Sequence, residues 1–177
     1  YINLDNERFI GQNDFRQFPQ SFDAFSWSTS FINNVDIYYA YLFSVNTNNA
    51  NGRAADGKHQ LSSNILNIDW TGSKFGGLGL YLYLNNDHTQ NLNSNITVGG
   101  RFTSPDDLSQ TDNYAYLFEV AYQHSKFNNP TSYNAYYMHF DLSKTLSDYV
   151  KWQIDNDTTL VKPITKSFMA YKLRLTE

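Results

Sequence analysis

The sequence predicts an all-β protein, an antiparallel up-and-down transmembrane β-barrel with about nine strands in this chain. Apolar and polar residues alternate with a period of two through most of the chain, and no segment shows a helical period. The chain holds 14 Tyr and 13 Phe but only 17% charged residues, whereas soluble domains carry about a quarter. Its polarity therefore comes mainly from uncharged side chains, which suits strands with one apolar and one wet face.

Nine segments carry the alternation, and each is predicted to be a strand. The clearest covers residues 35–45, where Ile37, Tyr39 and Tyr41 share one face. Lengths of roughly 7–11 residues match strands that cross a membrane. The predicted strands are residues 22–31, 35–45, 61–70, 78–84, 95–102, 114–123, 134–142, 149–155 and 168–175.

The connections between these segments are predicted to differ in length. Short ones are expected at residues 33–34, 73–77 and 143–147, and the Asn33-Asn34 pair indicates a tight hairpin. Long polar ones are expected at residues 46–60, 86–94, 103–113 and 156–166. Short turns at one end and long loops at the other are typical of outer-membrane barrels.

The charges of the predicted strands gather on one face, and the other face is aliphatic and aromatic. A soluble sandwich would bury the apolar face, whereas a membrane barrel turns that face to lipid and its charged face to a hydrated lumen. Aromatic residues near strand ends, such as Trp70 and Phe102, favour the membrane arrangement. The charged face carries Asp36, Asp69, Arg101, Glu119, His139, Asp141, Lys151, Asp155, Lys172 and Arg174.

Several other functions are not expected. A net charge of -4 without a basic run argues against nucleic acid, and the lack of cysteine excludes disulfides and thiolate metal sites. The four histidines share no metal-ligand spacing, and paired loop carboxylates such as Asp106-Asp107 offer too few ligands for Ca²⁺. His139 and Asp141 follow Ser132, but no glycine-framed serine supports a hydrolase. We therefore expect no enzyme, no metal and no cofactor.

The N-terminal segment resembles the alginate-export family of outer-membrane porins. The resemblance is carried by residues 4–11 (Leu-Asp-Asn-Glu-Arg-Phe-Ile-Gly), followed by 13–17 (Asn-Asp-Phe-Arg-Gln) and 21–24 (Ser-Phe-Asp-Ala). Residues 39–42, 58–61, 80–85, 97–103 and 114–123 also look like that family, so the similarity covers about residues 1–142. Only the first two segments are specific, because the others are common in barrel strands.

The resemblance implies a bacterial outer-membrane protein that is a monomer at full length. Its partners would be the lipid bilayer and lipopolysaccharide, and an anionic or sugar-like solute would pass passively through a lumen lined by Arg and Lys. Family barrels are longer than this chain, and an open sheet would leave bare edges in lipid. Residues 1–177 are thus expected to be one partial barrel domain, with the polar segment 1–20 folded into the lumen and strands over 21–177.

Eight residues are candidates for lining the pore. The family pattern implies Arg8, Arg16 and Arg101. The shared face adds a second group: Glu119, His139, Lys151, Lys172 and Arg174. The bases could bind carboxylates of a solute with charge-assisted hydrogen bonds, or they could pair with acids across the wall and hold its shape.

Two alternatives remain open from the sequence. A secreted or periplasmic β-sandwich or barrel could bury the apolar faces as its core and bind carbohydrate through Tyr and Trp residues. An adhesin or structural barrel could use the same strands without a conducting lumen. Aggregation in the absence of detergent would separate the membrane reading from the soluble one.

Overall fold

The computed structural model describes residues 21–46, 57–105, 114–147, 150–163 and 168–174, with the backbone alone from residue 145 on. The described residues form one nine-stranded sheet in which every strand pairs antiparallel with its neighbour in the chain. The strands are β1 (Ser21–Ile32), β2 (Val35–Asn46), β3 (Lys58–Ser73), β4 (Gly76–Asn85), β5 (Asn95–Thr103), β6 (Tyr114–Ser125), β7 (Tyr133–Ser147), β8 (Val150–Pro163) and β9 (Phe168–Arg174). A short 3-10 helix, η1 (Asn91–Asn93), lies between β4 and β5.

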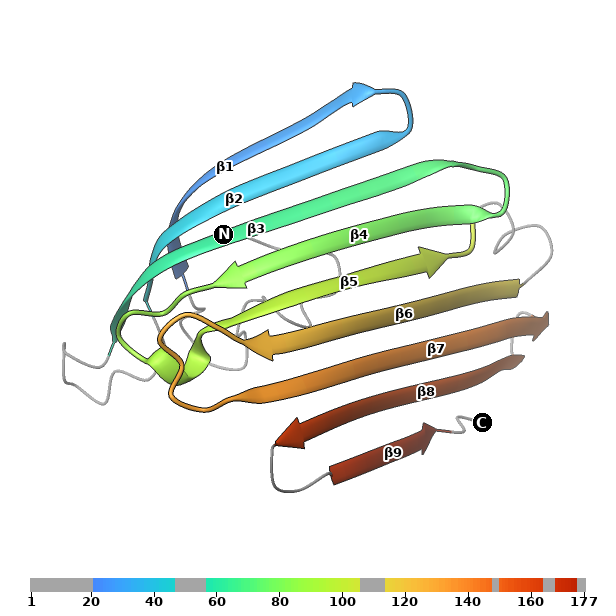
Figure 1. The fold of residues 1–177 in the computed structure, drawn as a ribbon. Coiled ribbons are helices and arrows are strands. Elements are labelled where there is room, and N and C mark those ends of the chain that lie inside the picture. The colour runs from blue at the N-terminus through green and yellow to red at the C-terminus, as the bar shows by residue number, and fades with distance from the viewer. Residues whose placement is uncertain (1–20, 47–56, 106–113, 148–149, 164–167, 175–177) are drawn as a thin grey trace.

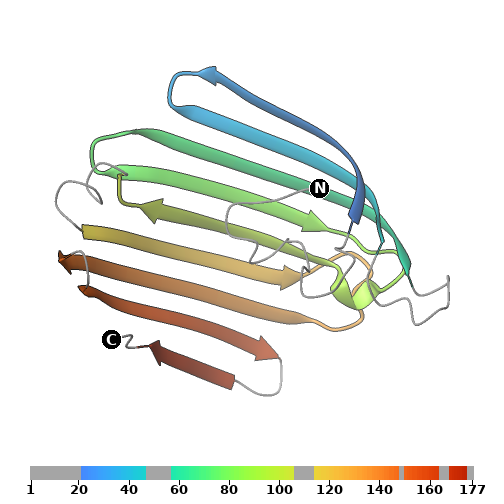
Figure 2. The same ribbon diagram turned by 180° about the vertical axis from the view of Figure 1, so that it is seen from behind.

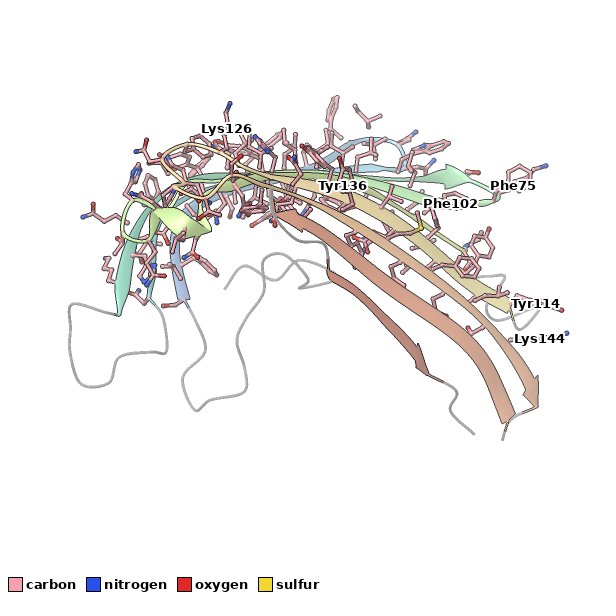
Figure 3. The ribbon with its side chains drawn as sticks, turned by 60° about the horizontal axis from the view of Figure 1, so that its bottom comes forward. Phe75, Phe102, Tyr114, Lys126, Tyr136 and Lys144 are labelled. Carbon is pink, nitrogen blue, oxygen red and sulfur yellow. The ribbon has the colours of Figure 1, made fainter. Side chains whose placement is uncertain are left out.

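The sheet is a single curved layer. Figures 1 and 2 show the strands side by side in chain order, from β1 at one edge to β9 at the other. Seen from its lower edge in Figure 3, the layer arches and has a convex and a concave side. In the described ranges β1 and β9 do not pair with each other, so the all-β up-and-down sheet is confirmed but is not closed into a barrel. No helix among these residues is long and apolar enough to cross a membrane.

All nine predicted strands are present, and several are longer than expected. Residues 143–147, predicted to be a turn, belong to β7, and residues 156–163, predicted to be a loop, belong to β8. The polar Asn156-Asp157 pair suggested a loop. However, β8 stays in register with β7 from Lys151 to Pro163, and the ladder of backbone hydrogen bonds outweighs the weak strand preference of Asn and Asp.

The lengths of the connections only partly follow the prediction. One end of the sheet, the turn end, has the connections 33–34, 74–75, 104–113 and 148–149, and the other, the loop end, has 47–57, 86–94, 126–132 and 164–167. The tight turns are as expected, and Asn34 takes the left-handed conformation (φ 61°) that such a hairpin requires. The connection 104–113 is long, as predicted for residues 103–113, but it lies at the turn end. The β8–β9 connection, predicted to be long, is short and lies at the loop end, so short turns are not confined to one end.

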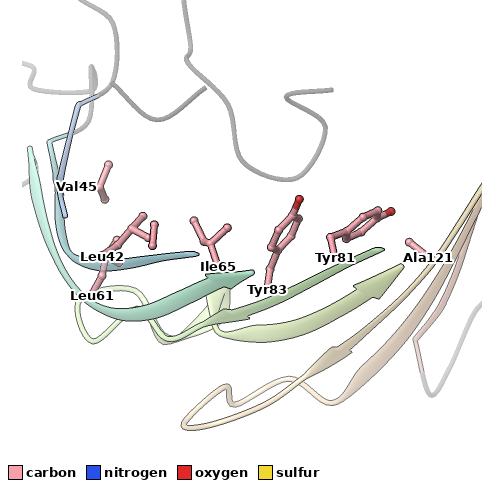
Figure 4. Close-up of a cluster of buried hydrophobic side chains, with 8 residues drawn as sticks. Leu42, Val45, Leu61, Ile65, Tyr81, Tyr83 and Ala121 are labelled. Carbon is pink, nitrogen blue, oxygen red and sulfur yellow. The ribbon is translucent and has the colours of Figure 1, made fainter. Parts of the chain in front are cut away.

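The two sides of the sheet differ in chemistry. Figure 4 shows a buried apolar cluster on the concave side, where Ile65, Tyr81 and Tyr83 from neighbouring strands point the same way. The convex side carries exposed large apolar residues such as Tyr136, next to half-buried ones such as Phe102, and both are labelled in Figure 3. The structure thus leaves much of the apolar surface exposed and gives the concave side both the polar groups and a small core.

The β4–β5 loop is held by a buried carboxylate at the loop end. Asp87, 3% exposed, accepts hydrogen bonds from the backbone N–H groups of Thr89 (2.9 Å) and Gln90 (2.8 Å). Its other oxygen lies 2.9 Å from Nδ1 of His59 and accepts from the Asn93 side chain at 3.1 Å. Burial alone would raise the pKa of Asp87, but these hydrogen bonds outweigh it and lower the pKa below its ordinary value.

We predict that Asp87→Asn frees this loop, because the amide would turn a donor toward His59 or the Asn93 amide. The loss should be about 2 kcal/mol of local stability, read as faster hydrogen exchange at the Thr89 and Gln90 amides. Because the native pKa lies below the unfolded value of about 3.9, the stabilisation is complete above that pH and is lost as pH falls through the native pKa. Unchanged exchange at the Thr89 and Gln90 amides in the variant at neutral pH would contradict this role.

Candidate pore-lining face

Several charged residues of the concave side lie in one row across the sheet. Neighbouring members are direct cross-strand partners except Asp69 and Arg101, which have Gly79 of β4 between them, so the row follows the direction of the backbone hydrogen bonds rather than the chain. We call Asp69, Arg101, Glu119 and His139 the charged row. In full, the register runs Asp36, Asp69, Gly79, Arg101, Glu119, His139, Asp157 and Lys172, from β2 to β9.

The first contact in the row crosses a whole strand. Arg101 on β5 places Nη2 3.7 Å from Oδ1 of Asp69 on β3, above the intervening Gly79 of β4. A Cβ at position 79 would lie 2.6 Å from that same carboxylate oxygen. Glycine in the middle of β4 therefore leaves the space in which the two side chains meet.

The second contact is built in the same way, one strand further on. Tyr81 on β4 lies over Gly99 of β5 and donates its hydroxyl hydrogen to Oε1 of Glu119 on β6 at 2.7 Å. A Cβ at Gly99 would lie 2.3 Å from Cζ of the Tyr81 ring. Glu119 is 1% exposed, and a buried carboxylate without such a donor would be strongly destabilising.

Tyrosine hydroxyls and amides line the concave side next to the row. Tyr83 stacks on Tyr81 with ring centroids 5.1 Å apart and donates to Oδ1 of Asn67 at 2.9 Å. Further along, the Gln123 amide donates to the hydroxyl of Thr97 at 2.9 Å. Tyr81 and Tyr83 are buried, so their rings and hydroxyls hold the sheet together, while the amides of Asn67 and Gln123 are half-buried and offer uncharged hydrogen-bonding groups on this face.

The charges of this face are mainly acidic in the part of the chain whose side chains are described. Asp36, Asp69, Glu119 and Asp141 share it with one guanidinium, that of Arg101. Asp36 and Asp69 are directly opposed, although like charges in that position destabilise a sheet. The described wall therefore does not by itself present a positive surface, and Arg101 is partly neutralised by Asp69.

The structure brings some of the predicted site residues together. Arg101, Glu119 and His139 occupy consecutive paired positions on β5, β6 and β7. The backbone register places Lys151 opposite Thr145, Lys172 opposite Asp157, and Arg174 opposite Asp155. Arg8 and Arg16 lie outside the described residues.

Sequence reasoning did not identify the crossing contacts made by Asp69 and Tyr81. The signal was present in glycines placed inside predicted strands, at positions 79 and 99, where a missing side chain often marks a close approach of neighbours. What the sequence lacked was the register, because Asp69 and Arg101 meet only when β3, β4 and β5 are correctly aligned.

The histidines have other local roles. His59 belongs to the loop held by Asp87, and Nε2 of His88 lies 2.8 Å from the Ser62 hydroxyl at the loop end. In the described ranges no carboxylate orients the second nitrogen of His88, so this contact lacks the third group of a catalytic triad. No three His, Asp or Glu side chains of the described residues gather closely enough to hold a metal ion.

We predict that Gly99→Ala destabilises the sheet, because its methyl group would displace the Tyr81 ring from Glu119. The expected cost is about 1–3 kcal/mol in the free energy of unfolding, measured by urea titration with tryptophan fluorescence. Gly100→Ala is the matched control, since its Cβ would meet the flexible end of Leu80 at 3.2 Å and the Gly79 carbonyl oxygen at 3.5 Å, which is an ordinary van der Waals contact. Equal effects of the two substitutions would argue against a special place for Tyr81.

Comparison of the chain with protein-family models, with curated proteins and with solved structures gives no match in any of the three.

Proposed function

We propose that this chain forms part of the wall of a bacterial outer-membrane β-barrel channel, through which anionic or sugar-like solutes pass passively. The concave side would face the lumen and the convex side would face lipid. The observation that carries the proposal is the reversed placement of the two faces, with large apolar side chains exposed and charged side chains on the inner side of the curve.

The exposed apolar side chains are contiguous. One cross-strand row joins Leu78, Phe102, Phe118 and Phe140 over β4 to β7. Two parallel rows complete the band: Leu80, Val120 and Met138, with Gly100 between Leu80 and Val120, and Val98, Tyr122 and Tyr136, next to the half-buried Leu82. Soluble proteins rarely expose apolar patches of more than a few hundred Å², so a band of this extent indicates a lipid or protein partner.

Lipid is the partner that best fits the backbone. The strands from β1 to β8 have between 9 and 16 residues, which is enough for a tilted strand to cross the hydrocarbon layer. Every interior strand satisfies its backbone groups with two neighbours, as a nonpolar solvent demands. The proposal requires that the outer edges of β1 and β9 also pair, through further strands that close the barrel.

The class of solute is inferred from the side chains of the concave side. The half-buried amides of Asn67 and Gln123 suit hydroxyl-rich solutes, and Arg101 offers a guanidinium to a carboxylate. The resemblance of residues 1–142 to the alginate-export family supports an anionic sugar as the solute. Lys151, Lys172 and Arg174 would add positive charge from β8 and β9.

The soluble alternative, a carbohydrate-binding sandwich, would need a second layer over the convex side. Within the described ranges the sheet has one layer, and none of these residues covers the rows that contain Phe118 and Val120. A structural barrel without a conducting lumen would have the same apolar convex side as a channel. Only a measurement of conductance distinguishes the two.

The first test is the behaviour of the native protein in mild detergent. We expect unheated and boiled samples to migrate differently on a gel, because a closed barrel resists the denaturing detergent until it is heated. The boiled sample also gives the mass of the whole protein and shows whether the closing strands belong to the same polypeptide. A protein that stays soluble without detergent and migrates identically in both lanes would refute the membrane proposal and favour the carbohydrate-binding module.

A second test addresses the lumen. In planar bilayers, Arg101→Gln should shift ion preference toward cations, because it removes the guanidinium among the carboxylates of the described wall. A charge at about 4 Å from a passing ion in water contributes about 1 kcal/mol, or roughly a fivefold change in preference. Lys144→Gln, which removes the same charge from the convex side, is the control and should leave the reversal potential unchanged. An unaltered preference in the Arg101 variant would exclude this face as the conducting surface.

A further inference from the structure

Two lysines at the turn end rest on aromatic rings of the convex side. Lys74 and Phe75 form the β3–β4 turn, and Nζ of Lys74 lies 5.2 Å from the centre of the Phe75 ring. Nζ of Lys144 lies 4.5 Å from the Tyr114 ring and donates to its hydroxyl oxygen at 2.6 Å. Figure 3 shows Phe75, Tyr114 and Lys144 along one edge of the arch.

The surrounding side chains complete an amphipathic belt. Phe102 stacks on Tyr116 with centroids 5.8 Å apart, and the Tyr116 hydroxyl donates to the backbone carbonyl of Phe75. Trp70 is exposed on β3, the strand that leads into the Lys74-Phe75 turn. We call Lys74, Phe75, Phe102, Tyr114, Tyr116, Lys144 and Trp70 the turn-end belt. Rings with a polar edge and lysines with long apolar stems are the side chains that occupy the headgroup level of a bilayer.

The belt carries positive charge without a described counter-ion. The ion pairs of the described residues join Lys58 to Asp23, His59 to Asp87 and Arg101 to Asp69, and none involves Lys74 or Lys144. The two ammonium groups also lie at the same end of the exposed apolar rows. Among the side chains that the structure describes, the loop end has Lys58, which pairs with Asp23, and the exposed Lys126, which is in none of these ion pairs.

From this arrangement we infer that the turn-end belt binds anionic phospholipid headgroups, with Lys74 and Lys144 contacting their phosphates. The aromatic rings hold the lysine stems at the edge of the apolar band, which places the ammonium groups at headgroup depth. The turn end then marks the leaflet that contains anionic phospholipid. This inference rests on the proposed membrane insertion and adds to it an orientation and a lipid partner.

The test measures insertion of the complete barrel, including the strands that pair with the outer edges of β1 and β9, from urea into vesicles. Vesicles of phosphatidylcholine alone are compared with vesicles of phosphatidylcholine mixed with phosphatidylglycerol, at low ionic strength. We expect the wild type to favour the anionic vesicles, and Lys74→Gln with Lys144→Gln to reduce that preference by roughly fivefold for each lysine, or about 25-fold together. High salt should abolish the preference by screening.

Lys126→Gln is the matched control, because it removes the same charge at the loop end and should leave the preference unchanged. Equal insertion of the wild type into both vesicles, or an equal loss of preference in the Lys126 variant, would overturn the headgroup site while leaving the channel proposal in place. Failure to insert into either vesicle would overturn the proposed membrane function and the headgroup site with it.

Discussion

The structure depends on one constraint, that a single-layer sheet has two faces and only one of them can be turned inward. The antiparallel ladder satisfies the backbone of every interior strand whichever face is inside. The side chains therefore determine which face lies on the concave side. Here the concave side carries both the charged row and the small apolar cluster around Ile65. The outer side keeps bulky apolar residues exposed, so the surroundings of the protein must supply what a second layer supplies in a sandwich.

Glycine determines how the inner side accommodates its charges. Two side chains that meet across an intervening strand need free space above that strand, and burying charged or hydroxyl groups without partners is costly. Gly79 and Gly99 remove the side chain of the strand in between, so that Arg101 meets Asp69 and Tyr81 meets Glu119 across it. Each glycine gives up some strand propensity, and the contact above it offsets that loss.

These contacts also explain why the two roles considered for the bases are compatible. Arg101 stabilises the wall through Asp69, yet its side chain stays partly accessible on the concave surface. The Tyr81–Glu119 hydrogen bond holds a carboxylate in place without neutralising it. A wall built this way keeps fixed charges in defined positions, which a selective passage needs.

Much of the fold could be predicted from the sequence, because a period of two is a local property of the chain. It identified all nine strands and the residues that share a face, including Arg101, Glu119 and His139. Strand ends such as residues 156–163 were missed, since polar residues there are kept in β8 by pairing with β7, which is not a local property. The crossing contacts were missed for the same reason, because they need the register of three strands at once.

The side-chain contacts at the loop end differ from those at the turn end, and this difference makes the two ends of the sheet distinguishable. At the loop end, Asp87 collects backbone N–H groups and His59 into a fixed turn, a polar arrangement suited to water. At the turn end, lysines lie on aromatic rings at the border of the apolar band, an arrangement suited to the boundary between water and lipid. A sheet with identical ends could enter a bilayer in either sense. In the proposed channel these two ends would place different chemistry at the two surfaces of the membrane, so the asymmetry that would orient it lies in the connections between its strands.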